Sequence, residues 1–429
     1  MSRPRVLVLA EHCNPEWPSL PVVGYKYACA LGRVVDMTLV THVRNRENIE
    51  KAGTMTGPVH YIDNEWLAGP MYRFARKLRG GSEVAWSTNQ MMAYPPYLAF
   101  ERQAWTGFRQ KLQEGAFDVI HRITPMSPTL PSYMSGRAKQ PFVIGPLNGN
   151  LNWPKQFSQE QRREREGLRK LRDFYKVLPY AKSTYRRASG ILAAFEHTVA
   201  DLPTTEMEKV VPMPEIGYDP EVFHARGRRL AFSGEGPYHF LYVGRLVPYK
   251  VPDIAIQAFT ESEVLRKHKL HIVGDGPELP RLQEMVRSTG AGDCVSFEGR
   301  KSQAEVGEFM RRCDAFIFPS IRELGAGVVI EAMASGLLCL VTDYGAPGDL
   351  AAQGRGVRIA LSDRSSMVQA YRRELENCIQ DRENVERMIR KAEHYASSLY
   401  DWDSKAIYTA KIYQALISQQ PLNTFDDYL

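Results

Sequence analysis

Two glutamates in the second half of the chain are the residues whose type and spacing most clearly suggest chemistry. Glu323 and Glu331 are eight positions apart, which is at most about 12 Å along a helix. Small residues lie between them, at Gly325, Ala326 and Gly327, where the pattern predicts a helix start. Because backbone N–H groups at a helix start favour negative charge, this segment suits a diphosphate that joins two hydroxyl-bearing rings, with one ring for each carboxylate.

The surroundings of Glu331 favour a functional role over a solvated one. It follows Val328-Val329-Ile330 and precedes Ala332-Met333, an apolar run in which an ordinary surface charge is not expected. The alternative interpretation, two surface glutamates, is therefore the weaker one.

A second group of residues could hold an anion. A predicted strand at 239–244 ends in Gly244 and is followed by Arg245 and Lys250, before a helix that begins near Asp253. Two cations beside a helix N-terminus can bind a phosphate through charge and helix dipole together. Taken alone, ordinary surface cations explain this segment equally well. A glycine turn at 274–277 follows the next strand and is a weak signal by itself.

The elements that must position these residues alternate between apolar strands and amphipathic helices, which is typical of parallel sheets flanked by helices. Proline and glycine residues interrupt the periodicity at 211–236, and we place a linker at 215–218. The sequence therefore predicts two α/β halves. The expected strands are 6–10, 36–41, 119–123, 142–145 and 191–194 in the first half, and 239–244, 269–273, 294–297, 315–318 and 338–342 in the second.

Composition limits the class of protein. The chain has 429 residues, of which 44% are hydrophobic and 24% charged, as in globular proteins of two or three domains. No apolar stretch reaches the roughly 18 residues of a membrane span. The apolar run at 6–10 fits a strand better than a signal-peptide core, so we expect a cytoplasmic protein.

The six cysteines are widely spaced, which favours buried apolar residues over a zinc site or disulfides.

Four motifs together resemble glycosyltransferase family 4, a family of group 1 glycosyltransferases with a retaining mechanism. They are Gly244-Arg245 with Lys250, the 274–277 turn, the strand end 297–299, and Glu323 with Glu331, and their order and spacing match over about 238–350. The resemblance implies the GT-B fold, in which two Rossmann-like domains face an interdomain cleft. It implies an acceptor-side domain at 1–215, a nucleotide-sugar-binding domain at 216–401, and a C-terminal helix at 402–418 that packs back on the first domain.

The resemblance also implies roles for the donor-side residues. Arg245 and Lys250 would neutralise the diphosphate, and Glu331 would accept hydrogen bonds from the ribose hydroxyls. Glu323 would hold the donor sugar, together with the N–H groups of Gly325, Ala326 and Gly327. The remaining expected donor-site residues are Gly244, Gly274 and Phe297, the last of them beside the base.

The first half resembles the family at three positions. Gly24 matches the glycine loop after the first strand, although Val23 replaces the usual second glycine. His121 matches the active-site histidine of the family, although Ile123 stands where a second histidine is common; a core histidine is the alternative. Asn148 lies in a loop, 145–149, that is expected to contact the acceptor.

The implied reaction moves a sugar to an acceptor hydroxyl with retention, and the departing phosphate helps to deprotonate that hydroxyl. We expect a UDP- or GDP-sugar donor, no cofactor and no catalytic metal, because the one Asp-x-Asp triplet, 401–403, lies far from the donor motifs. The acceptor is a glycan, a lipid-linked glycan or a small molecule, in glycan, polysaccharide or glycolipid biosynthesis. The alternatives are another GT-B enzyme, such as a nucleotide-sugar epimerase, and a catalytically silent sugar-nucleotide-binding protein.

The positive surplus of the chain is concentrated in one segment. Residues 161–187 contain ten Lys and Arg but three Asp and Glu, within a predicted basic amphipathic helix at 158–187. Such a helix suits the anionic inner face of a membrane, to which the protein would bind peripherally. A helix packed on its own domain with a solvated basic face, or an anionic soluble acceptor, explains the charge as well. Nucleic acid is not expected, since no nucleic-acid-binding module accompanies the charge.

Overall fold

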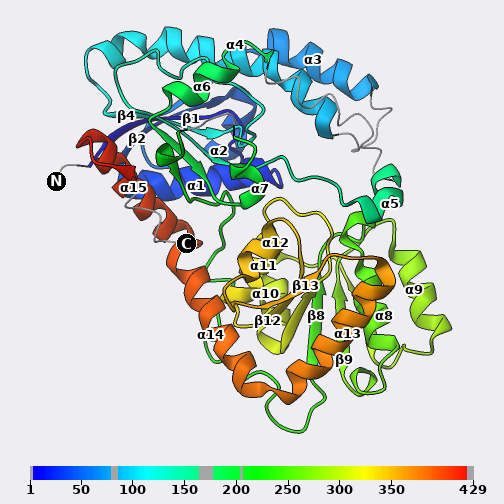
Figure 1. Cartoon of the computed structure of the whole chain (residues 1–429). Helices are drawn as coiled ribbons and strands as arrows, with labels where there is room; N and C mark the ends of the chain where they lie inside the picture. The colour runs from blue at the N-terminus through cyan, green and yellow to red at the C-terminus, as the bar shows by residue number, and fades with distance from the viewer. Residues whose placement is uncertain (1–2, 79–85, 164–176, 203–205, 423–429) are drawn as a thin grey trace. The chain divides into compact units, whose positions relative to one another are not determined.

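The computed structural model of the chain describes residues 3–78, 86–163, 177–202 and 206–422, with side chains of 74–92 excepted. The chain forms two compact units (Figure 1). The first unit contains Met1–Asn150, Arg165–Glu215 and Trp402–Leu429, and the second contains Leu151–Glu164 and Ile216–Asp401. The first unit is therefore built from three separate stretches of sequence.

The first unit contains a seven-stranded parallel sheet in the order β3-β2-β1-β4-β5-β6-β7. The central strands β1, β4 and β5 are buried over nearly their whole length, as expected for a parallel sheet covered on both faces. The strands are β1 (Arg5–Ala10), β2 (Asp36–His42), β3 (Val59–Ile62), β4 (Val119–Thr124), β5 (Phe142–Leu147), β6 (Gly190–Ala193) and β7 (Val210–Val211).

The helices of the first unit pack on this sheet and on one another. Tyr97, Phe100 and Phe108 of the long helix α4 lie in the main apolar cluster. The last helix, α15, contacts α1: the hydroxyls of Tyr27 and Thr409 are 2.5 Å apart. The helices are α1 (Leu20–Val34), α2 (Arg46–Ala52), α3 (Glu65–Leu78), α4 (Trp86–Gln113), α6 (Ala181–Arg187), α7 (Glu196–Val199) and α15 (Trp402–Ile417).

The second unit contains a six-stranded parallel sheet in the order β10-β9-β8-β11-β12-β13. The strands are β8 (His239–Val243), β9 (Lys269–Val273), β10 (Val295–Gly299), β11 (Ala315–Phe318), β12 (Leu338–Asp343) and β13 (Val357–Ala360). The helices are α5 (Ser158–Arg163), α8 (Pro252–Thr260), α9 (Leu279–Ser288), α10 (Gln303–Arg312), α11 (Gly327–Ala334), α12 (Ala346–Ala351), α13 (Arg364–Gln380) and α14 (Arg382–Leu399), with a 3-10 turn, η5 (Pro248–Lys250), after β8.

The predicted α/β class with parallel sheets is confirmed, and each of the ten expected strands is present. Three further strands, β3, β7 and β13, were not predicted. β3 and β13 are half exposed at sheet edges, and β7 has two residues, so none of them carries a long apolar run.

All six cysteines are buried, as predicted. Within the described ranges, no helix is both long and apolar enough to cross a membrane.

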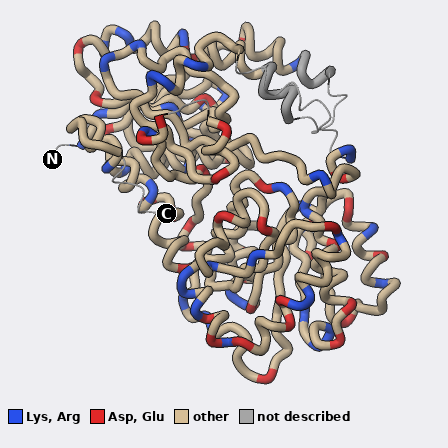
Figure 2. Tube along the Cα trace, viewed as in Figure 1, with Lys and Arg blue, Asp and Glu red and all other residues tan. Residues whose placement is uncertain are grey.

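Lys and Arg are interspersed with Asp and Glu along the described parts of both units (Figure 2). The predicted basic helix at 158–187 is wrong in its described C-terminal part, because a turn at 178–180 with a left-handed Tyr180 precedes a separate helix, α6. The structure also describes α5, and the 164–176 segment lies outside the described residues.

Candidate functional site

The donor-side motifs lie at the carboxyl edge of the sheet in the second unit, the edge at which open parallel sheets bind ligands. The N–H of Gly244 donates to the carbonyl of Val273 at 3.0 Å, and the N–H of Gly274 donates to that of Gly299 at 2.9 Å. Gly274 has a φ of +145°, and a Cβ there would overlap the carbonyl oxygen of Gly244. Gly274 therefore lets the ends of β8, β9 and β10 pack against one another.

Lys250 and Glu323, 73 positions apart, form an ion pair at this edge. Nζ of Lys250 donates to Oε1 of Glu323 at 2.5 Å, and the two side chains are only 12% and 14% exposed. The hydroxyl of Ser320 donates to the same carboxylate oxygen at 3.0 Å. Nζ also lies 4.8 Å from the centre of the Phe318 ring. The structure thus brings together two residues that the sequence analysis assigned to one ligand.

The charge of Lys250 is maintained by its neighbours. Burial alone would lower the pKa of Lys250, but the Glu323 carboxylate and the nearby Tyr249 outweigh burial, and the pKa is raised above its ordinary value. Lys250 is therefore a fixed positive charge at neutral pH. A fixed cation in a site with little access to water is suited to stabilising negative charge that develops on a ligand.

The loop that carries Glu323 is held by backbone hydrogen bonds from both sides. The N–H of Ile321 donates to the carbonyl of Tyr249 at 3.0 Å, and the N–H of Ala346 donates to the carbonyl of Glu323 at 3.2 Å. Ala326 has a φ of +52° and precedes α11, which begins at Gly327 as the small residues predicted. A left-handed alanine is uncommon, and such strain is often found at ligand sites.

The remaining donor-side residues lie around the same loops. Arg245 is exposed, and no residue of the described ranges forms an ion pair with it. Glu331 is half-buried on α11, eight positions after Glu323. Phe297 is half-buried on β10, at the edge where that strand meets Gly274.

A segment from the first half of the sequence also contacts these loops. Residues Leu151–Glu164 belong to the second unit. The ring of Trp153 lies 5.1 Å from the guanidinium carbon of Arg322, next to Glu323. The carbonyl of Asn152 accepts a hydrogen bond from the Tyr344 hydroxyl at 2.8 Å. We refer to residues 151–163 as the strap; no motif in the sequence indicated that it lies beside the Glu323 loop.

Ion pairs fix the far end of the strap. Glu160 of α5 pairs with Arg364 of α13 at 2.5 Å, and Arg364 also pairs with the buried Asp253 of α8. Arg163 pairs with the buried Glu278, at the start of α9. Ion pairs that involve buried carboxylates, with Arg364 shared between two of them, position chain segments more firmly than isolated surface pairs do.

His121, on β4 of the first unit, is fully buried. Its Nε2 lies 2.7 Å from the carbonyl oxygen of Gly145 and its Nδ1 lies 2.5 Å from the hydroxyl of Tyr413. Nε2 therefore donates to the carbonyl, and Nδ1 accepts from the tyrosine. Burial lowers the pKa of His121 to about 3, so the ring is neutral. This geometry corresponds to the alternative interpretation, a core histidine with both nitrogens occupied.

Gly24 and Asn148 also have packing roles. Gly24 lies inside α1 rather than in a loop, because α1 begins at Leu20; a Cβ at Gly24 would lie 2.5 Å from the carbonyl oxygen of His12. Asn148 follows β5, donates to Glu215 and accepts from the Thr198 hydroxyl at 3.3 Å. Contact of Asn148 with an acceptor stays a prediction.

The sequence analysis did not select Glu11, which directly follows β1 at the carboxyl edge of the first sheet. Its side chain is 12% exposed, and its carboxylate lies 3.7 Å from Nδ1 of His12. Burial raises the pKa of Glu11 to about 7. The signal that could have identified it is a carboxylate immediately after a buried parallel strand.

Comparison with known proteins shows which family part of the second unit resembles. Residues 228–395 match the model of the glycosyl transferases group 1. The chain is 30% identical over 184 residues to a glycogen synthase of Mycobacterium tuberculosis, and 30% identical over 186 residues to a D-inositol 3-phosphate glycosyltransferase of Streptomyces avermitilis. The match to the glycogen synthase covers 42% of this chain and 43% of the relative. The match to the D-inositol 3-phosphate glycosyltransferase covers 41% of this chain and 39% of the relative. The chain thus spans less than half the length of these two relatives.

Solved structures match over nearly the whole chain. A glycosyltransferase from Rickettsia africae has a TM-score of 0.61 at 11% identity and covers 98% of this chain and 100% of its own. A sucrose-phosphate synthase from Thermosynechococcus elongatus has a TM-score of 0.59 at 15% identity, with coverage of 97% and 100%. Anabaena HepE, solved in complex with UDP and glucose, has a TM-score of 0.58 at 15% identity, with coverage of 96% and 100%.

At these identities the solved structures establish the fold, and the family model shows that the segment 228–395 resembles the glycosyl transferases group 1. The chain therefore has the GT-B fold, with two parallel α/β units, and its residues 228–395 are similar to the glycosyl transferases group 1.

Proposed function

We propose that this protein is a retaining glycosyltransferase of family 4 that moves a sugar from a nucleoside-diphosphate donor to an acceptor hydroxyl. The observation that carries the proposal is the mostly buried Lys250–Glu323 pair, in loops that precede α8 and α11. It lies inside the segment that matches the group 1 family. A cation, a carboxylate and a helix start at one sheet edge suit a ligand with both phosphate and hydroxyl groups.

The charged donor-side residues and the 325–327 segment then hold different parts of the donor. Lys250 and the exposed Arg245 bind the diphosphate and stabilise it as it leaves. Glu331 accepts hydrogen bonds from ribose hydroxyls. Glu323 and the N–H groups of the 325–327 segment hold the sugar. Catalysis rests on stabilisation of the leaving group, and the departing phosphate takes the proton of the incoming hydroxyl on the same face of the sugar.

We further propose a UDP- or GDP-sugar as donor, without a metal or a cofactor. The HepE neighbour was solved with UDP and with UDP-glucose, which supports the uridine donor as the first to test. The acceptor is a glycan, a lipid-linked glycan or a small molecule. Peripheral binding to an anionic membrane through 158–187 belongs to the same proposal, and co-sedimentation with anionic and neutral vesicles tests it.

A thermal-shift screen against UDP-, GDP- and ADP-sugars is the first test. A ligand that binds only the folded state stabilises it by about 2.7 kcal/mol at a hundredfold excess over its Kd. We expect a shift with one nucleotide class, and loss of that shift in Arg245→Ala/Lys250→Ala. If no donor shifts the unfolding of the second unit, the proposed donor site is wrong.

Transfer itself is tested with the donor identified in this way. Release of nucleoside diphosphate in the presence of candidate acceptors, followed by NMR of the product anomer, tests the reaction and its retention. The same assay in excess EDTA tests metal independence. Donor binding without nucleotide release, both in the wild type and in Glu323→Gln, would instead indicate a silent sugar-nucleotide-binding protein.

A further inference from the structure

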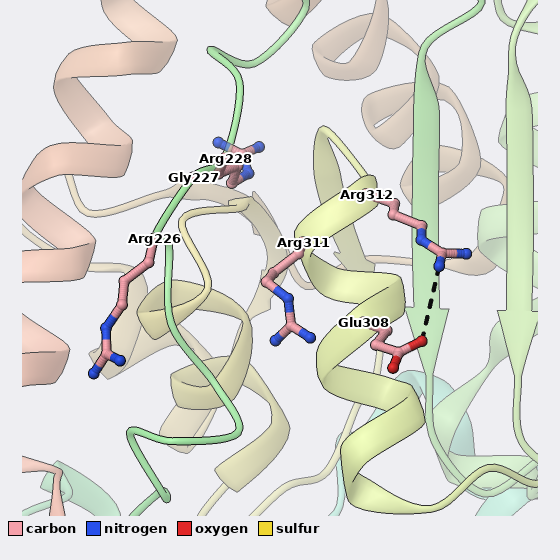
Figure 3. Close-up of a pocket in the computed structure, with 6 residues that line it drawn as sticks. All are labelled: Arg226, Gly227, Arg228, Glu308, Arg311 and Arg312. Carbon is pink, nitrogen blue, oxygen red and sulfur yellow. Dashed lines mark ion pairs between the residues drawn. The ribbon is translucent and has the colours of Figure 1, made fainter.

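A cavity lies in the second unit at the sheet edge opposite the loops of Lys250 and Glu323. We call it the arginine pocket: a cavity of about 360 Å³ lined by Arg226, Gly227, Arg228, Glu308, Arg311 and Arg312 (Figure 3). The 226–228 segment precedes β8, and the other residues belong to the last two turns of α10. Nη2 of Arg228 donates to the carbonyl of Cys313 at 3.1 Å, two residues before β11 begins. The pocket therefore lies at the amino edge of the sheet.

The lining carries a net charge of +3, from four arginines and one glutamate. Arg226 is 3.4 Å from Glu221, and Arg312 is 3.8 Å from Glu308, with all four side chains more than half exposed. Exposed pairs at these distances contribute little. The two other arginines donate to backbone carbonyls, Arg311 to Val222 at 2.9 Å and Arg228 to Cys313. A carbonyl orients a guanidinium without neutralising its charge, although Asp314 and Glu386 act on the charge of Arg228.

Arg228 is the most constrained of these residues. Its Nε is buried, and no atom of the described residues accepts a hydrogen bond from it. Burial lowers the pKa of Arg228, against the opposing effect of Asp314. Its side chain lies against Gly336, where a Cβ would be 3.3 Å from Cδ of Arg228. The guanidinium is thus held in place with one donor unused.

The end of α10 explains part of this arrangement but not all of it. Arginines in the last turn of a helix are favoured because the carbonyl end carries about half a negative charge. That partial charge is much smaller than the net charge of +3 on the residues that line the pocket. Figure 3 shows Arg226 and Arg228 on the segment before β8 and Arg311 on the neighbouring helix, so the positive groups come from two separate elements.

We propose that the arginine pocket binds a small phosphate-bearing molecule. Planar guanidinium groups match phosphate oxygens with paired hydrogen bonds, and arginine is the residue best suited to this recognition. The volume lies within the range of roughly 300–1,000 Å³ found for small-molecule sites. The site goes beyond the proposed glycosyl transfer, because it lies away from the loops that hold Lys250 and Glu323.

Isothermal titration of the full chain with ribose 5-phosphate, and with ribose as the uncharged control, tests the proposal. Arg226→Gln/Arg312→Gln removes two exposed charges of the pocket. Arg287→Gln/Arg373→Gln removes two exposed charges from α9 and α13 as a matched control. We expect saturable binding of ribose 5-phosphate but not of ribose, weakened about tenfold or more by the first double variant and unchanged by the second.

Arg245→Gln separates this site from the donor site, and circular dichroism checks that each variant is folded. Binding that survives in Arg245→Gln and is lost in Arg226→Gln/Arg312→Gln supports the pocket even if the proposed donor chemistry is wrong. Three results would overturn the proposal. Binding of ribose 5-phosphate could be weakened equally by both double variants, it could be lost in Arg245→Gln alone, or it could fail to saturate at millimolar ligand.

Discussion

At the scale of single residues, charge pairing in poorly hydrated surroundings decides what the donor-side groups can do. Lys250 and Glu323 are mostly buried, and each is the principal partner of the other. Removing one member of such a pair leaves an uncompensated charge, which costs more than the pair contributes as a whole. The pair can therefore be tested apart from any assay of transfer.

We expect Lys250→Met to lower the free energy of unfolding of the second unit by about 3 kcal/mol. Lys250→Met/Glu323→Gln should recover most of this loss, because the second change removes the orphaned charge. Denaturant unfolding of the wild type, both single variants and the double variant gives the coupling energy. Additive effects of the two substitutions would show that the ion pair is not the source of the stability.

Glu11 leads to a prediction with a defined dependence on pH. Burial raises the pKa of Glu11 from 4.5 to about 7, so between these values the folded protein binds more protons than the unfolded chain. Stability therefore falls as the pH rises through this interval. Glu11→Gln, which cannot ionise, should be more stable than the wild type above pH 7 by up to about 3 kcal/mol.

Unfolding curves of the wild type and Glu11→Gln on both sides of this interval measure that difference. The gain of Glu11→Gln should shrink towards zero as the pH approaches 4.5. A difference that does not depend on pH would show that Glu11 is charged in the folded protein throughout.

At the scale of elements, the strap shows how a segment far away in sequence contacts the loop that carries Glu323. Trp153 is buried and its ring lies over Arg322, the neighbour of Glu323. The ion pairs of α5 with α13 and α9 hold the other end. The strap therefore restricts the loop that carries Glu323.

If the proposed transfer is correct, Trp153→Ala should raise the KM for the donor about three- to tenfold and change kcat little, because a stacked cation–π contact is worth about 0.5–2 kcal/mol. Trp153→Phe should restore most of the affinity. Trp66→Ala, at an exposed position on α3, is the matched control. A fall in kcat with KM unchanged would contradict a positioning role for the strap.

At the scale of the whole molecule, the chain begins and ends in the same unit. Trp402–Ile417 pack on α1, and Tyr413 hydrogen-bonds to His121 of β4. The buried Lys405 donates to the carbonyl of Pro214 at 2.6 Å. The last helix thus completes the core of a unit whose other stretches end at Asn150 and Glu215.

Deletion of the chain after Asp401 should therefore destabilise the first unit selectively. It exposes the apolar face of α1 around Tyr27 and leaves the buried His121 without one hydrogen-bond partner. Hydrogen exchange should accelerate in β1 and β4, with much smaller changes in β8 and β11. Unchanged protection of β4 would show that the first unit folds without α15.

The sequence alone predicted the fold class and the central strands correctly, and it selected the residues of the proposed donor site. Buried parallel strands are long apolar runs, and each donor motif is compact, with its glycines and charges within a few positions of a strand end. Short edge strands such as β3 and β13 carry no such run and were missed. Most of the candidate donor site could therefore be selected without coordinates.

The pairing of these residues follows from tertiary packing and not from local sequence. The Lys250–Glu323 contact spans 73 positions and the His121–Tyr413 contact spans 292. The strap and the arginine pocket likewise join elements that no local pattern connects. Periodicity and capping report the conformation of neighbouring residues, whereas burial and hydrogen bonding depend on which distant elements pack together. That is why His121 matched a motif in the sequence but lies in the core as a neutral, fully bonded ring.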